Sequence, residues 1–86
     1  MSQQPLIDPL RGPDYTYVQV ANHIAARIEV GEWTHKLPAE RALAEEYGVA
    51  YQTLRHAMQE LRNRGLIITK QGRGTFVASA APPAGN

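Results

Sequence analysis

The sequence predicts a small α+β fold in which three helices are followed by a two-stranded β-hairpin. Three observations carry this prediction. Apolar residues recur at helical spacing in three segments up to residue 62, short β-branched runs replace them from residue 66, and glycines separate the segments. The chain of 86 residues has the length of one domain. We expect that domain to span residues 15–78, between a proline-rich arm over residues 1–14 and a tail of small residues over 79–86.

The first helix is predicted over residues 17–30. Its apolar side chains are spaced so that they share one face: Tyr17, Ala21, Ile24 and Ile28. Gly31 follows as a residue that can take the left-handed conformation with which many helices end. A polar connection over residues 32–36 then leads to the second helix.

The second helix is predicted to begin at Pro38, because proline suits the first turn of a helix, and to end at Gly48. Only residues 48–50 separate it from a third helix, which ends at Gly65. The buried face of the third helix is predicted to be Leu54, Ala57, Met58 and Leu61. So short a link, opening with a glycine, lets two helices cross steeply as in a helix-turn-helix.

The β-hairpin is predicted from the runs LIITK and TFVA, with QGRG between them. Gly72 and Gly74 would allow the chain to reverse, and Arg73 would then stand alone at the tip. A dinucleotide-binding loop is excluded here, because that motif needs a further glycine at residue 77 and a helix opening there. The segment instead continues into a strand.

The outer face of the third helix carries side chains that suit DNA bases. At 100° per residue, Gln52, Arg55, His56 and Gln59 point away from the apolar face, and their polar tips can hydrogen-bond to base edges in a major groove. Charge is also uneven along the chain. Residues 1–50 hold four cationic and seven acidic side chains, whereas residues 51–86 hold five cationic and one acidic. This asymmetry indicates a basic surface that meets a polyanion, the alternative being a solvated charged helix face.

Catalysis, metal binding and membrane insertion are not expected. The chain has no cysteine, and its three histidines are not at ligand spacing. Glu45 and Glu46 are adjacent on a helix and point about 100° apart, which is unsuited to a shared acid–base site. The N-terminus has no basic region followed by an apolar run, so we expect a cytoplasmic protein. We also expect the chain to have no cofactor.

Four segments together resemble the winged helix-turn-helix domain of the GntR family of bacterial transcription regulators: YVQVANHIAARI, LPAERALAEEYGVAYQTLRHAM, LRNRGLI and GRGTFV. The resemblance covers residues 17–77. It implies that the third helix enters the major groove of DNA and that the hairpin, or wing, reaches into the minor groove. Family contacts carry over to Arg41, Gln52, Thr53, Arg55 and Gly72.

Neighbouring residues on the same faces complete the predicted DNA-binding set: Arg41, Tyr51, Gln52, Thr53, Arg55, His56, Gln59, Lys70, Gln71, Gly72, Arg73 and Gly74. The expected partner is double-stranded DNA with an inverted-repeat operator, bound at the nucleoid by a chain that pairs with a second copy on the DNA. The chain would act as a repressor. The alternative is a winged-helix module that docks on another protein.

The chain departs from the family pattern at three positions. Ala50 and Tyr51 stand where the family has Ser or Thr and then Arg, and Ala39 stands where a capping serine is usual. With that arginine missing, Arg73 is expected to carry a large share of binding. Family members also continue into a ligand-binding and dimerising domain, so the chain resembles small members made of little but the DNA-binding module. Met1 favours a stand-alone regulator over an excised domain, and no effector site is visible.

Overall fold

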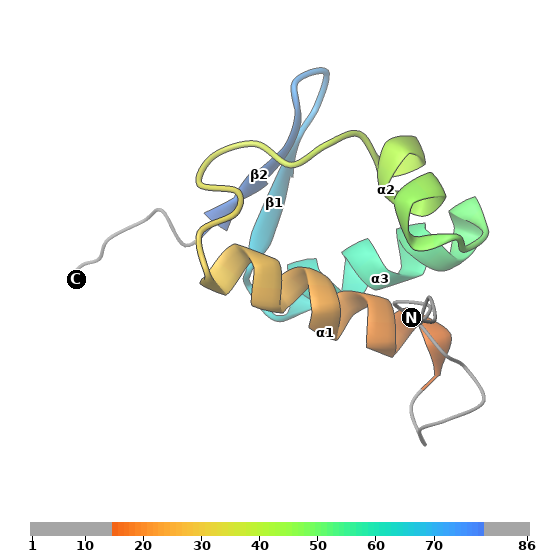
Figure 1. Ribbon diagram of the computed structural model, residues 1–86. Coiled ribbons are helices and arrows are strands. Elements are labelled where there is room, and N and C mark those ends of the chain that lie inside the picture. The colour runs from red at the N-terminus through yellow and green to blue at the C-terminus, as the bar shows by residue number, and fades with distance from the viewer. Residues whose placement is uncertain (1–14, 79–86) are drawn as a thin grey trace.

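The computed structural model describes residues 15–78, which contain three helices and one two-stranded antiparallel sheet (Figure 1). The elements are α1 (Thr16–Glu29), α2 (Glu40–Tyr47), α3 (Tyr51–Asn63), β1 (Ile67–Lys70) and β2 (Gly74–Val77). The α+β prediction and the order of the elements are confirmed. The predictions for residues 1–14 and 79–86 lie outside the described residues.

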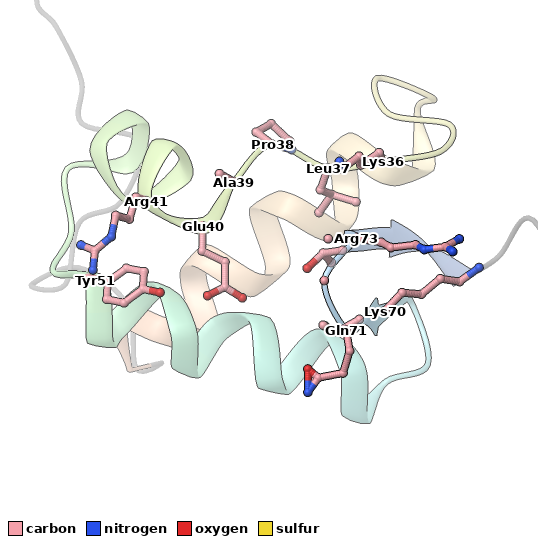
Figure 2. Close-up of a pocket in the computed structure, with 14 residues that line it drawn as sticks. Lys36, Leu37, Pro38, Ala39, Glu40, Arg41, Tyr51, Lys70, Gln71 and Arg73 are labelled. Carbon is pink, nitrogen blue, oxygen red and sulfur yellow. The ribbon is translucent and has the colours of Figure 1, made fainter.

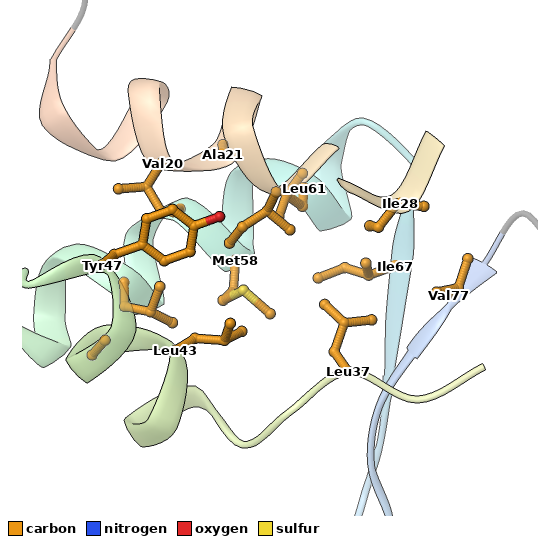
Figure 3. Close-up of a cluster of buried hydrophobic side chains, with 14 residues drawn as sticks. Val20, Ala21, Ile28, Leu37, Leu43, Tyr47, Met58, Leu61, Ile67 and Val77 are labelled. Atoms are coloured by element: carbon orange, nitrogen blue, oxygen red, sulfur yellow. The ribbon is translucent and has the colours of Figure 1, made fainter. Parts of the chain in front are cut away.

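The core forms where α1 lies against α3, with α2 closing one end and the hairpin the other (Figures 1 and 3). All four apolar residues predicted for α3 are fully buried. On the predicted face of α1, Ala21, Ile24 and Ile28 are buried and Tyr17 is half-buried. Val20, which was not part of the predicted face, is buried as well. Because α1 and the inner face of α3 fill the core together, the outer face of α3 is left to solvent.

The link between α2 and α3 has the predicted geometry. Gly48 takes the left-handed conformation at φ 68°, and the N–H of Val49 donates to the carbonyl of Ala44 at 3.1 Å. Residues 48–50 therefore reverse the chain in one tight turn. The expected loss of capping is also confirmed: Ala39 and Ala50 are the N-cap residues of α2 and α3, and neither helix has a side-chain cap hydrogen bond.

The start of α2 differs from the prediction. Pro38 does not lie in the first turn, because the helix begins at Glu40 and Ala39 is still extended, with φ −60° and ψ 149°. The reason lies in the preceding residue. The side chain of Leu37 is buried in the core, and its N–H donates to the carbonyl of Thr75 at 2.9 Å. This pairing keeps the chain extended past the proline.

The tip of the hairpin also differs from the prediction. Gly74 is the first residue of β2 and pairs with Lys70, so the loop consists of residues 71–73 and does not include Gly74. The N–H of Arg73 donates to the carbonyl of Lys70 at 2.8 Å, and Gly72 supplies the positive φ of 73° within the turn. Arg73 is therefore the last residue of the loop and does not stand between two loop glycines.

The connection between α1 and α2 adds a third extended segment beside the hairpin. Lys36 forms an antiparallel bridge with Phe76, and the N–H of Val77 donates to the carbonyl of His35 at 2.7 Å. This pairing was not predicted. It fixes the wing to the segment that leads into α2, as the chain crossing the hairpin in Figure 1 shows.

A polar cluster around Arg27 fixes the far end of α2 to α1. Its guanidinium donates from Nε to Glu32 at 2.9 Å, lies 2.9 Å from the carboxylate of Glu46, and donates to the Tyr47 hydroxyl at 3.1 Å. Arg27 lowers the pKa of Glu32, whereas burial raises the pKa of Tyr47. The guanidinium also lies over the ring of Trp33, 4.2 Å from its centre. These contacts hold the helix-turn-helix in one orientation on α1.

Candidate nucleic-acid interface

The cationic side chains of residues 15–78 divide into those with a close hydrogen-bonding partner within the fold and those without one. Arg27 is paired as described above. Arg62 donates from Nη1 to the hydroxyl of Thr69 at 2.6 Å, and Arg64 donates from Nε to Glu60 at 2.9 Å. These three arginines stabilise the fold, and part of the hydrogen-bonding capacity of each guanidinium is used within it.

The other cations of residues 15–78 are close to one another in space: Lys36, Arg41, Arg55, Lys70 and Arg73. All but Arg55 line a hollow of about 570 Å³ between the segment before α2, the first residues of α2 and α3, and the wing (Figure 2). We call this the central hollow. Seven predicted contact residues line it: Arg41, Tyr51, Lys70, Gln71, Gly72, Arg73 and Gly74.

The other predicted contact residues lie on α3. Gln52, Arg55, His56 and Gln59 are exposed, as the helical spacing predicts, and Thr53 is half-buried. Their surroundings differ. The ring of His56 stacks on Tyr17, and the amide of Gln59 donates to Asn63 at 3.1 Å. Gln52 makes no side-chain hydrogen bond to another residue of the described range, so Gln52 and Arg55 are the most available side chains of this face.

Tyr51 joins the outer face of α3 to the start of α2. The guanidinium carbon of Arg41 lies 4.2 Å from the centre of the Tyr51 ring, and that of Arg55 lies 5.9 Å away. Glu40 and Glu45 are acidic groups of this region, and one carboxylate oxygen of Glu40 lies 4.0 Å from Nε of Arg55. At that distance the pair is weak, since 59% of the Arg55 side chain is exposed to solvent.

Two lysines lie near the Phe76 ring of the wing, Lys70 from the hairpin and Lys36 from the segment before α2. The ammonium of Lys70 lies 5.3 Å from the centre of the Phe76 ring, and that of Lys36 lies 5.9 Å away. In Figure 2 the side chains of Lys70 and Arg73 leave the hairpin in one direction and Gln71 leaves it in another. Lys36 was not predicted as a contact residue. Its only signal in the sequence is a positive charge just before the second helix.

Residues 15–78 lack both a membrane-spanning helix and a metal-binding cluster. No helix there is long and apolar enough to cross a membrane. The same range contains no group of three histidine, cysteine, aspartate or glutamate side chains that could hold a metal ion.

Solved structures with this arrangement include DNA complexes. The DNA-binding domain of AraR, in complex with operator ORR3, is 35% identical, superposes with a TM-score of 0.72, and is matched over 90% of this chain and 93% of that chain. A GntR family transcriptional regulator from Listeria monocytogenes is 27% identical with a TM-score of 0.72, over 80% of this chain and 62% of that one.

Curated relatives are longer regulators. The histidine utilization repressor of Pseudomonas putida is 39% identical over 69 residues, which is 78% of this chain and 28% of that protein. The transcriptional repressor NagR of Bacillus subtilis is 37% identical over 79% of this chain and 29% of its own length. The chain thus spans less than a third of these relatives. The sequence profile described as "Bacterial regulatory proteins, gntR family" matches residues 16–77, and the chain belongs to this family.

Proposed function

We propose that this chain is a DNA-binding transcription regulator that represses its targets by occupying a specific operator. The observation that carries the proposal is the division of the cations. Arg27 and Arg64 form salt bridges within the fold and Arg62 donates to Thr69, whereas the cations around the hollow form no salt bridge and no side-chain hydrogen bond in the described range: Lys36, Arg41, Lys70 and Arg73. The AraR domain in complex with operator DNA and the two repressors support it.

The shape of this face suits a duplex. The exposed side of α3 would lie in the major groove, which is about 12 Å wide and admits a helix. Gln52 would read a base edge there, and Arg55 a guanine edge or a nearby phosphate. The central hollow then lies beside the groove that α3 occupies. Its rim of cations would neutralise the sugar-phosphate strand that separates the major groove from the minor groove.

The wing would reach the adjacent minor groove. Arg73 is exposed at the end of the loop, and its side chain forms no hydrogen bond or salt bridge within residues 15–78. A narrow minor groove has an enhanced negative potential that attracts an inserted arginine. Gly72 is exposed too, and without a side chain it lets the backbone of the loop approach the groove closely.

We also propose that two copies bind an inverted-repeat operator at the nucleoid. A helix-turn-helix dimer places its recognition helices about one helical turn, or roughly 34 Å, apart along the DNA. The test is analytical ultracentrifugation with and without operator. A chain that pairs only on DNA sediments as a monomer alone and as two copies per duplex when bound. A tight dimer without DNA would contradict this.

The test of DNA recognition begins with selection of bound oligonucleotides, followed by fluorescence anisotropy at several salt concentrations. Arg55→Ala should weaken binding to the selected site about tenfold or more, because charge-assisted hydrogen bonds are lost. Arg64→Ala, at the C-cap of α3, is the matched control, since its guanidinium is paired with Glu60. Equal affinities of the wild type and both variants, with equal salt slopes, would reject this face, and a selection that yields no bound DNA would favour the protein-docking alternative.

A further inference from the structure

Tyr51 contacts cations from both helices of the helix-turn-helix. It is the first residue of α3 and is half-buried. Arg41, which lies over its ring at 4.2 Å, comes from the first turn of α2, and Arg55, at 5.9 Å, comes from the next turn of α3. One aromatic ring is therefore within reach of two guanidiniums that the proposed function assigns to DNA.

Neither arginine has a strong competing partner. Arg41 forms no salt bridge within residues 15–78, and the carboxylate of Glu40 is 4.0 Å from Arg55. An arginine side chain that has no partner samples many rotamers, and immobilising it on binding costs conformational entropy. The face of an aromatic ring attracts a guanidinium, and a planar group resting on a ring has fewer orientations.

The surroundings of Tyr51 give the ring this position. It lines the central hollow on one side and a smaller hollow beside Ala44, Gly48 and Val49 on the other. Arg41 lines both hollows as well. Figure 2 shows the Arg41 guanidinium next to the ring, with the tyrosine hydroxyl directed away from it. Without the ring, Arg41 would lose its cation–π contact, and the two hollows that it lines would be enlarged.

We infer that Tyr51 is a positioning residue, whose ring holds Arg41 and Arg55 in orientations suited to neighbouring DNA phosphates. The inference rests on the proposed function. It assigns the role of Tyr51 to the ring rather than to the hydroxyl, so the residue acts through two arginines. The tyrosine at this position supplies no charge of its own. Its ring instead reduces the conformational entropy that the side chains of Arg41 and Arg55 lose when DNA binds.

A double-mutant cycle on operator affinity tests this coupling. Tyr51→Leu should weaken binding about tenfold, because two arginine side chains would then lose their rotamer freedom when DNA binds. Arg41→Ala should then cost at least about threefold less in the Tyr51→Leu background than in the wild type, because the arginine is no longer held. Tyr51→Phe should restore the full cost of Arg41→Ala. Independent, multiplicative effects of Tyr51→Leu and Arg41→Ala would overturn the inference. Thermal unfolding shows that each variant is folded.

A measurement without DNA separates this inference from the proposed function. A ring beside Arg41 shifts the NMR signals of its δ-methylene protons upfield in the free protein. The shift should be present in the wild type and in Tyr51→Phe, and absent in Tyr51→Leu. Its absence from the wild type would overturn the positioning role even if DNA binds. If the wild-type protein shows the shift but the selection yields no bound oligonucleotide, the proposed function is rejected instead.

Discussion

The imidazole of His56 lies flat on the phenol ring of Tyr17, with ring centres 3.6 Å apart and ring planes 9° apart. The contact joins the outer face of α3 to the first turn of α1. Tyr15 extends the stack, with its ring 6.2 Å from that of Tyr17. His56 is therefore exposed to solvent and yet held by its own fold, which distinguishes it from Gln52 on the same helix face.

We predict that His56→Ala lowers stability more than it lowers operator affinity. Losing an aromatic pair of this kind costs about 0.5–1.5 kcal/mol of unfolding free energy, measured by urea denaturation. Operator affinity should fall less than for Arg55→Ala, because the ring is turned to Tyr17. Tyr17→Phe is the control, since it keeps the stack and should leave stability close to that of the wild type. A loss of affinity as large as that of Arg55→Ala would show that His56 contacts DNA directly.

The parts of the fold that follow a period could be predicted from the sequence. Each helix buries a stripe repeated over several turns, as Leu54 and Leu61 show on α3, and each ends near a glycine. The exposed face of α3 follows from the same period, because a buried stripe fixes which residues lie opposite it. The short link between α2 and α3 could also be predicted, because Gly48 can take the left-handed conformation that ends α2.

The parts that depend on a single contact between distant residues could not be predicted. The bridge between Lys36 and Phe76 and the hydrogen bond from Leu37 to Thr75 have no repeating pattern, yet together they keep Pro38 outside α2 and place Lys36 beside the central hollow. The sequence also gives the positions of the charged residues but not the groups to which they bind in the fold. It could not separate Arg62, which is bonded to Thr69, from Arg73, which is unpaired in the described range.

The two glycines near the wing tip should differ in their tolerance of substitution. Gly72 has a φ of 73°, near the left-handed region that asparagine also adopts, and open space surrounds it. Gly74 has a φ of 118°, outside that region, and an added Cβ would lie 2.7 Å from Cε of Lys36. Gly74→Ala should cost about 1–3 kcal/mol in urea denaturation and displace Lys36 from the central hollow. Gly72→Asn is the matched control, and an equal cost for both would contradict this assignment.

Stability should depend on pH through the pair of Arg27 and Glu32. Hydrogen bonding from Arg27 lowers the pKa of Glu32 below its ordinary value of 4.5. A lowered pKa means that the folded state favours the charged carboxylate, so this contribution is present above about pH 4.5 and is lost as the pH falls through the folded pKa. Glu32→Gln should therefore be less stable than the wild type at neutral pH, and the two stabilities should converge in acid.

The control for this titration is Glu29→Gln. Glu29 is exposed close to Glu32 in the chain but forms no salt bridge within residues 15–78. Urea denaturation of both variants and the wild type across the acid range separates the paired carboxylate from general charge effects. A stability gap between Glu32→Gln and the wild type that stays constant in acid would show that the ion pair contributes nothing.

Arg73 should carry more of the operator affinity than the hydroxyl of Tyr51. Arg73→Ala removes an exposed guanidinium from the wing tip, and binding should weaken about tenfold or more with a salt slope reduced by about one. Tyr51→Phe removes only a hydroxyl and keeps the ring that contacts Arg41, so affinity should change by no more than about threefold. Fluorescence anisotropy on the selected operator at several salt concentrations measures both. If Tyr51→Phe cost more than Arg73→Ala, the recognition helix would contact DNA through the tyrosine hydroxyl, and the wing would be secondary.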